Sequence, residues 1–274
     1  MNLKSIKKNY SKNGYVILKN FFSKKQIYEL EIGIIKNAIK IIPNKNINQL
    51  SVSDLNLNKE LIMLKKNDPK IFGSFYDSLQ HNAKLYQMFS MQKISRVLKL
   101  LNNKGLEEYC LSNIGVRMDV PFDTRHKYNW HQDRAYYPQN RDGNKGMLIW
   151  APISILKKDI GPLKIKPKSH KLGFNFVKKT QKKNYSPQYT LPKNKLSKFK
   201  TINLNIKPGD VAFVNFHTYH ASGSNISNKI RFAIQARYSD TTDLDFLPFS
   251  FNVFFNSLIK KKLNKKGFSL KDIQ

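Results

Sequence analysis

The sequence contains six histidines, and one of them stands two residues before an aspartate. His131 and Asp133 flank Gln132, and residues i and i+2 of an extended segment point to the same face. Their side chains can therefore bind one metal ion together. His220 follows the apolar segment 210–216 and can supply a third ligand from another strand.

Two imidazoles and one carboxylate on one face of an octahedron suit Fe(II) that activates O2, because three positions stay open. A 2-oxo acid can take two of these positions, and O2 can take the third. Arg231 lies shortly after His220 in another apolar segment. Its guanidinium can hold the distal carboxylate of 2-oxoglutarate through two parallel hydrogen bonds.

Other residues that could do chemistry have simpler interpretations. Cys110 is the only cysteine of the chain, which excludes an intrachain disulfide and every multi-cysteine zinc site, and we expect it to be buried in a strand. His217 is expected near the end of the barrel rather than on the metal. His170 is expected to hydrogen-bond the backbone, and Asp210 is expected to shape a tight turn.

The formal net charge is +31, from 49 Lys and Arg against 18 Asp and Glu. Such an excess favours polyanionic partners. The chain is also rich in Lys, Asn and Ile, as AT-rich genomes produce, which explains many lysines but not the shortage of acids. Because the lysines are dispersed and aromatic residues do not interleave with them, a role on nucleic acid is disfavoured without being excluded.

We find no signal peptide and no apolar stretch long enough to span a membrane, which predicts a cytoplasmic protein.

Helical patterns dominate the first part of the chain. Residues 14–19 predict a short strand, and Ser23 can cap a helix after it. Residues 44–68 are polar and predict a loop with at most one short helix. Residues 69–102 predict one or two amphipathic helices. The apolar positions of these helices, expected in the core, are Ile27, Leu30, Ile34, Ile35, Ala38, Phe72, Phe75, Leu79, Leu85, Met88 and Phe89.

From about residue 108 to 238 the pattern changes to short β-branched runs between turns that contain Gly and Pro. Many short strands after a helical part predict an all-β barrel or sandwich that the N-terminal helices buttress. The basic segment 172–199 is expected to be a long irregular loop. The runs that predict strands are 109–120, 146–155, 162–167, 201–207, 210–216 and 230–238.

Several motifs, in order and at suitable spacing, resemble the phytanoyl-CoA dioxygenase family over roughly residues 11–240. They are NGYVILKNFFSKKQIYEL near the N-terminus, WHQD at 130–133, Trp150-Ala151-Pro152, GPLKIKPKSHK at 161–171 and KPGDVAFVNFHTYHASGSNISNKIRFAIQARYSD at 207–240. The length of 274 residues predicts one domain, 1–274, with a helical part (1–107) before the strands. The resemblance implies a double-stranded β-helix core of jelly-roll or cupin type (108–240). The lysine-rich basic tail (241–274) is expected to be a solvated helix or frayed end.

The resemblance also implies Fe(II), 2-oxoglutarate and O2 as cofactor and co-substrates. Asp133 stands where the halogenase variant would have Gly or Ala, so halogenation is disfavoured. The resemblance assigns His131, Asp133 and His220 as iron ligands, Arg231 and Ser222 as partners of the oxoglutarate carboxylate, and Trp150 and Tyr128 as walls of the oxoglutarate side of the pocket.

The sequence therefore predicts a dioxygenase that hydroxylates a C–H bond of a small substrate and releases succinate and CO2. Arg117, Arg134 and Arg141 favour an anionic substrate, although Arg134 could equally be a solvated rim residue. Tyr137 could line the substrate pocket or belong to the barrel core, as could Tyr136. Two alternatives stay open: a non-catalytic metal-binding barrel that binds a small molecule or nucleic acid, and an oxygenase that acts on a nucleotide-linked substrate. The sequence does not identify the substrate, the oxidative outcome or the oligomeric state.

Overall fold

A computed structural model describes residues 2–42, 51–123, 127–137, 145–175, 177–180, 188–243 and 246. Arg141 and nearly all of the predicted basic tail, 241–274, lie outside these ranges, so the predictions for them are unchanged. Within the described residues, no helix is both long and apolar enough to cross a membrane.

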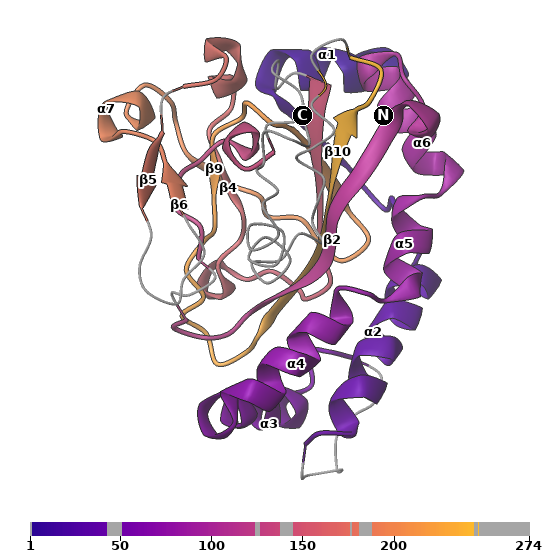
Figure 1. Cartoon of the computed structure of the whole chain (residues 1–274), viewed down its shortest axis with the longest axis vertical. Coiled ribbons are helices and arrows are strands. Elements are labelled where there is room, and N and C mark those ends of the chain that lie inside the picture. Colours follow the sequence, from indigo (N-terminus) through magenta and orange to yellow (C-terminus); the bar gives the residue numbers. More distant parts are fainter. Residues whose placement is uncertain are drawn as a thin grey trace, which may run out of the picture.

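The N-terminal part is helical and lies along one side of the molecule (Figure 1). The predicted capping of α2 is confirmed: Ser23 and Gln26 form a capping box, with each side chain accepting a hydrogen bond from the backbone N–H of the other. The elements of this part are α1 (Leu3–Asn13), β1 (Tyr15–Leu18), α2 (Lys24–Ile39), α3 (Leu55–Asn67), α4 (Pro69–Leu79), α5 (Ala83–Phe89) and α6 (Gln92–Asn102).

Two segments of this part contain more helix than the sequence predicts. The loop predicted over 44–68 contains the 13-residue helix α3, which begins after the cap Asp54 and buries Leu57 and Leu61 one turn apart. Segment 69–102 forms three helices, because Asn82 starts a new helix by accepting a hydrogen bond from the Lys84 N–H. In both segments a polar side chain caps the N-terminus of the additional helix. All of the apolar residues expected in the core are buried.

The second part of the chain is β-rich, as the alternating patterns predict. Each of the six predicted runs contains a strand. The strands are β2 (Tyr109–Asp119), β3 (Gly146–Pro152), β4 (Lys164–Ile165), β5 (Lys178–Thr180), β6 (Gln188–Thr190), β7 (Ile202–Asn203), β8 (Val211–Asn215), β9 (His220–Ala221) and β10 (Arg231–Asp240).

The segment 172–199 is not simply an irregular loop. Its described residues contain the antiparallel hairpin β5–β6 and the short helix α7 (Lys193–Leu196). The β5 side chains are all exposed, so this hairpin has no apolar alternation by which the sequence could reveal it.

Two antiparallel sheets pack face to face and form the double-stranded β-helix core that the resemblance implies. The larger sheet has the strand order β1-β8-β3-β10-β2, and the smaller has the order β7-β4-β9. Apolar residues of both sheets, such as Trp150, Val214 and Ile165, fill the space between them. The helices cover the outer face of the larger sheet (Figure 1).

Alternation along β10 decides which side chains reach the space between the sheets. Phe232, Ile234, Ala236 and Tyr238 join the core beneath the helices. The intervening positions 231, 235 and 237 carry polar side chains that line a pocket on the opposite face. The centre of this strand therefore serves the core with one face and a polar site with the other.

Candidate metal centre

His131, Asp133 and His220 lie together in a pocket between the two sheets. All three are buried, and one ligand atom from each lies within 4.8 Å of the others. The Asp133 Oδ1 oxygen is 3.5 Å from the His131 Nε2 nitrogen and 3.3 Å from the His220 Nε2 nitrogen. No other group of His, Cys, Asp or Glu with ligand geometry exists among the described residues.

Local backbone geometry brings these three side chains together. Gln132 is extended (φ −115°, ψ 133°), so the flanking His131 and Asp133 face the pocket. The Gln132 side chain instead donates a hydrogen bond to the His217 carbonyl at 2.8 Å. His131 and His220 form an antiparallel bridge with reciprocal backbone hydrogen bonds of 3.0 and 3.1 Å. Strand pairing therefore brings His220 beside the other two side chains.

Backbone carbonyls orient both imidazole rings for metal binding. The Nδ1 atom of His131 lies 2.6 Å from the Asn129 carbonyl oxygen, and the Nδ1 atom of His220 lies 2.9 Å from that of Thr218. Because a carbonyl can only accept, each Nδ1 donates and each Nε2 keeps its lone pair for a metal ion. Burial and then the neighbouring His220 lower the pKa of His131, which keeps this ring neutral near neutral pH. The donor set fits a divalent cation.

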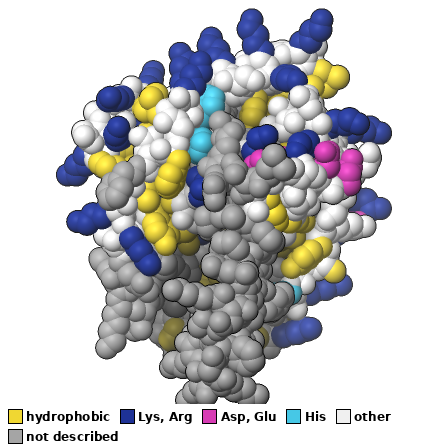
Figure 2. Space-filling model, turned by 45° about the horizontal axis from the view of Figure 1, so that its top comes forward, with side chains coloured by type: hydrophobic (Ala, Val, Ile, Leu, Met, Phe, Trp, Pro, Cys, Tyr) yellow, Lys and Arg dark blue, Asp and Glu magenta, His cyan; other side chains and the backbone are white. Residues whose placement is uncertain are grey.

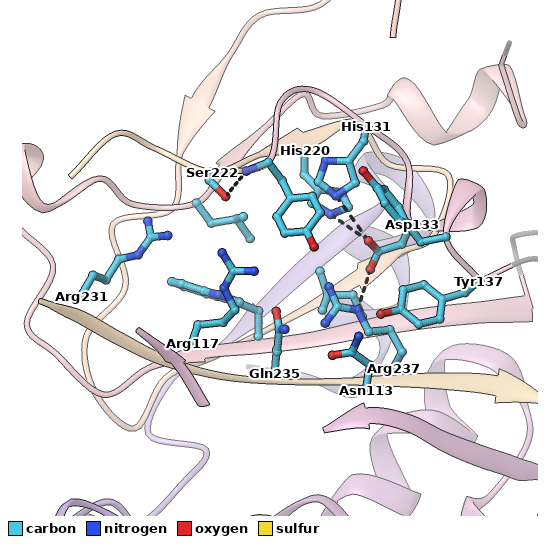
Figure 3. A pocket seen from close by; sticks show the side chains of 15 residues that line it. Asn113, Arg117, His131, Asp133, Tyr137, His220, Ser222, Arg231, Gln235 and Arg237 are labelled. Carbon is cyan, nitrogen blue, oxygen red and sulfur yellow. Dashed lines mark hydrogen bonds and ion pairs between the residues drawn. The ribbon is translucent and has the colours of Figure 1, made fainter. Parts of the chain in front are cut away.

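A buried arginine faces the second oxygen of the aspartate. Arg237 Nε donates to Asp133 Oδ2 at 3.1 Å (Figure 3). Burial alone would raise the pKa of Asp133, but the charge of Arg237 holds it well below its usual range. The carboxylate is therefore ionised, with Oδ1 directed at the imidazoles and Oδ2 at the guanidinium.

Arg231 lies at the other end of the pocket (Figure 3). Its Nε and Nη2 atoms donate to Asp119 Oδ2 at 3.0 and 2.6 Å, and Arg117 Nη2 donates to Asp119 Oδ1 at 3.0 Å. Burial alone would raise the pKa of Asp119, but the charges of Arg231 and Arg117 lower it to about 2. Arg231 Nη1 is buried and has no hydrogen-bond partner among the described residues. This nitrogen can donate a hydrogen bond to the carboxylate of a ligand.

The pocket has a volume of about 280 Å³. This is close to the lower limit of typical small-molecule sites. Its lining residues are Asn113, Arg117, Tyr128, His131, Asp133, Tyr136, Tyr137, Leu148, Trp150, Leu163, His220, Ser222, Arg231, Gln235 and Arg237.

Most residues singled out in the sequence lie on this pocket. Trp150, Tyr128 and Ser222 line it, as do Tyr137 and Arg117. The backbone N–H of Tyr128 donates to Ser222 Oγ at 3.2 Å, which orients the hydroxyl (Figure 3). Whether these residues contact oxoglutarate or substrate stays a prediction.

Arg134 is placed differently. It is not among the residues that line the cavity, and its guanidinium lies over the Phe174 ring, 5.3 Å from the ring centre. This position agrees with the rim alternative, and a substrate contact stays a prediction.

The structure also describes three residues for which a structural role was expected, namely His170, Asp210 and Cys110. His170 Nε2 is 3.0 Å from the Ser11 carbonyl, as expected for a structural histidine. Asp210 accepts hydrogen bonds from the backbone of Asn20 and Lys207 in the turn before β8. Cys110 lies on β2 as expected, but it is half-buried rather than buried; this partial burial raises the pKa of its thiol to about 11. At that pKa the thiol stays protonated near neutral pH, which does not suit a nucleophile.

Sequence reasoning missed Arg237, Asp119 and Asn113. Arg237 could have been found, because it lies six residues after Arg231 on the same face of one strand. Asn113 has φ +46° and lies where the pairing of β10 with β2 shifts register between Gln235 and Arg237. This β-bulge lets Asn113 line the pocket, and no local sequence signal predicts it.

A comparison with sequence models of protein families finds a match over most of the chain. The sequence model of the family described as phytanoyl-CoA dioxygenase (PhyH) matches residues 10–233. A comparison with curated protein sequences finds no significant match.

Three solved structures of similar fold are distant in sequence from this chain. The epimerase SnoN in complex with Fe3+, alpha ketoglutarate and nogalamycin RO superposes with a TM-score of 0.60 at 15% identity, covering 90% of this chain and 88% of SnoN. EctD from S. alaskensis with 2-oxoglutarate and 5-hydroxyectoine gives a TM-score of 0.56 at 14% identity, covering 88% and 76%. EvdO2 from Micromonospora carbonacea var. aurantiaca complexed with 2-oxoglutarate gives 0.55 at 13%, covering 87% and 93%.

Proposed function

Because the chain belongs to the phytanoyl-CoA dioxygenase family, we propose that it is an Fe(II)- and 2-oxoglutarate-dependent dioxygenase that hydroxylates a C–H bond of a small substrate. The observation that carries this proposal is the buried group of His131, Asp133 and His220, with both Nε2 atoms facing one carboxylate oxygen. Two imidazoles and one carboxylate are the ligand set suited to non-haem Fe(II).

In this proposal the chain holds and orients the reactants. The two Nε2 atoms and Asp133 Oδ1 would hold the metal ion. Arg231 Nη1, which has no partner among the described residues, binds the distal carboxylate of 2-oxoglutarate. Ser222 donates a further hydrogen bond to that carboxylate. The small volume of the pocket limits the water that surrounds the reactants.

When bound, Fe(II) and 2-oxoglutarate supply an O2-dependent oxidation in which oxoglutarate becomes succinate and CO2, one oxygen atom of O2 enters succinate, and the other enters the new hydroxyl group. The role of the protein is to place one substrate C–H bond next to the metal.

A second candidate is the inversion of a carbon stereocentre without net hydroxylation. The fold similarity to the epimerase SnoN favours it. Once a substrate is identified, the mass of the product separates the two candidates, because hydroxylation adds one oxygen atom and epimerisation adds none.

The proposal is tested by measuring metal binding, oxoglutarate binding and succinate release with the purified full chain. We expect it to bind Fe(II) and oxoglutarate and to release succinate slowly even without substrate. Asp133→Ala should abolish succinate release, because it removes a metal ligand. Arg231→Lys should keep the metal and weaken oxoglutarate binding by about tenfold or more, because lysine cannot make the bidentate contact.

The matched control is Asp77→Ala, which changes an exposed aspartate on α4 and should behave like the unmodified chain. If the chain binds no oxoglutarate, the proposed function is wrong. If oxoglutarate binds but Asp133→Ala changes nothing that can be measured, the alternative of a non-catalytic binding barrel is favoured.

A further inference from the structure

Arg237 has a guanidinium nitrogen that the candidate metal centre does not use. Its Nε donates to Asp133 Oδ2, but its Nη1 atom is buried and has no hydrogen-bond partner among the described residues. The side chain is only 10% exposed. An unpaired N–H of a buried charged group is costly, so its position beside a cavity indicates that a ligand satisfies it.

Polar side chains line the pocket on the side of this guanidinium (Figure 3). The guanidinium lies over the Tyr137 ring, 5.3 Å from its centre, and Tyr137 is hydrogen-bonded to the Asn113 side chain. Asn113 is exposed, so this end of the pocket is accessible from solvent. Gln235 precedes Arg237 on the same face of β10 and also lines the cavity (Figure 3). Together these groups can donate several hydrogen bonds to one small oxyanion.

The net charge of the pocket favours the binding of one more anion. Three guanidinium groups, those of Arg117, Arg231 and Arg237, face the two carboxylates of Asp119 and Asp133. The charges of a divalent metal ion and of dianionic oxoglutarate cancel. The loaded pocket would therefore keep an excess of one positive charge, which favours an anionic substrate.

Oxoglutarate can pair with only one of the two nitrogens that lack a hydrogen-bond partner among the described residues, Arg231 Nη1 and Arg237 Nη1. Arg231 and Arg237 are six residues apart on one strand, so their Cα atoms are separated by about 20 Å at roughly 3.3 Å per residue. In the proposed function, one carboxylate of oxoglutarate binds the metal and the other binds Arg231. Arg237 Nη1 then needs a different partner.

We propose that Arg237, with Tyr137 and Asn113, forms a second anion subsite that binds a carboxylate or phosphate of the substrate next to the metal triad. This inference rests on the proposed function, and it names the substrate class: a small molecule whose anionic group lies close to the carbon that reacts. The Arg237–Asp133 ion pair would link binding of this anion to the orientation of the metal ligand.

The subsite is tested by titrating the full chain, loaded with Fe(II) and oxoglutarate without O2, with acetate, inorganic phosphate and neutral acetamide. Binding is followed by tryptophan fluorescence, because Trp150 lines the pocket. We expect acetate and phosphate to bind, and acetamide to bind at least about tenfold more weakly. Arg237→Lys keeps the charge beside Asp133 but removes Nη1, and should weaken anion binding about tenfold while oxoglutarate affinity stays unchanged.

Two further variants keep the test decisive. Tyr137→Phe leaves both ion pairs intact and should also weaken anion binding, which provides a test if Arg237→Lys does not fold. Arg96→Gln changes an exposed arginine on α6 and should have no effect.

The inference is overturned if the loaded chain does not distinguish acetate from acetamide, or if folded Arg237→Lys binds anions as the unmodified chain does. It is equally overturned if Arg237→Lys weakens oxoglutarate instead of the added anions, because the guanidinium then belongs to the oxoglutarate site. If metal and oxoglutarate do not bind but the metal-free chain binds anions through Arg237, the proposed function fails and the anion subsite remains.

Discussion

Asp119 holds two arginines of the pocket, and its ionisation should contribute to stability. Its side chain is 11% exposed, and its pKa falls from 3.8 to about 2 in the folded chain, because the attraction of Arg231 and Arg117 exceeds the opposing effect of burial. A carboxyl group whose pKa is lower in the folded than in the unfolded chain stabilises the fold. This stabilisation is fully present above the pKa of the unfolded chain and is lost as the pH falls through the pKa of the folded chain. The size of this shift corresponds to about 2 kcal/mol.

Asp119→Asn tests this contribution in urea unfolding experiments at several pH values. The free energy of unfolding should fall for the unmodified chain between about pH 4 and pH 2 by an amount that the variant lacks. The difference between the two proteins should therefore shrink by about 2 kcal/mol over this interval. A difference that is independent of pH would show that the aspartate does not titrate as the ion pairs imply.

At the scale of elements, two glycines let the segment before β4 pass close to the segment after β9. Gly161 has φ +77°, and a Cβ on it would lie 2.5 Å from the Ser224 carbonyl oxygen. A Cβ on Gly223 would lie 2.4 Å from the Pro162 carbonyl oxygen. Because both obstacles are backbone atoms, no side-chain movement can relieve them. This crossing positions the chain directly after Ser222, which lines the pocket.

Gly223→Ala should therefore lower the free energy of unfolding by about 1–3 kcal/mol, as overpacking does. Gly73 provides the matched control, because it lies within α4 and a Cβ there meets nothing within 4 Å. Gly73→Ala should raise stability by roughly 0.5–1 kcal/mol, since alanine loses less backbone entropy in a helix. Urea unfolding of the two variants should give effects of opposite sign, and effects of the same sign would contradict this account.

At the scale of the whole molecule, the chain carries a formal net charge of +31. In Figure 2, Lys and Arg side chains are spread over the displayed face, whereas Asp and Glu are few. Such a surface should attract polyanions without selecting them.

Binding of duplex DNA to the chain should therefore weaken steeply with salt, by roughly a thousandfold between about 50 and 200 mM. Succinate release without substrate should change little over the same range, because the buried pocket is screened much less than the surface. If DNA accelerates succinate release and salt removes that acceleration, the active site uses a nucleic-acid or nucleotide-linked substrate, and the small-substrate proposal is wrong.

The sequence by itself determined the features that depend on short-range patterns. The spacing of His131 and Asp133 requires only an extended Gln132, and the alternating runs predict strands because each must bury one face. The hairpin β5–β6 was missed because its exposed polar residues carry no such pattern. Helix α3 does contain apolar residues one turn apart, Leu57 and Leu61, but the polar residues between them outweighed this signal.

Only the tertiary structure decided which distant groups meet. Arg231 and Arg237 occupy equivalent positions on one face of β10, yet one pairs with Asp119 and the other with Asp133. The register of β10 against β2 places Arg231 opposite Asp119, whereas Asp133 reaches Arg237 from a separate segment beside His131. Register depends on packing across more than a hundred residues of chain, and no local pattern specifies it.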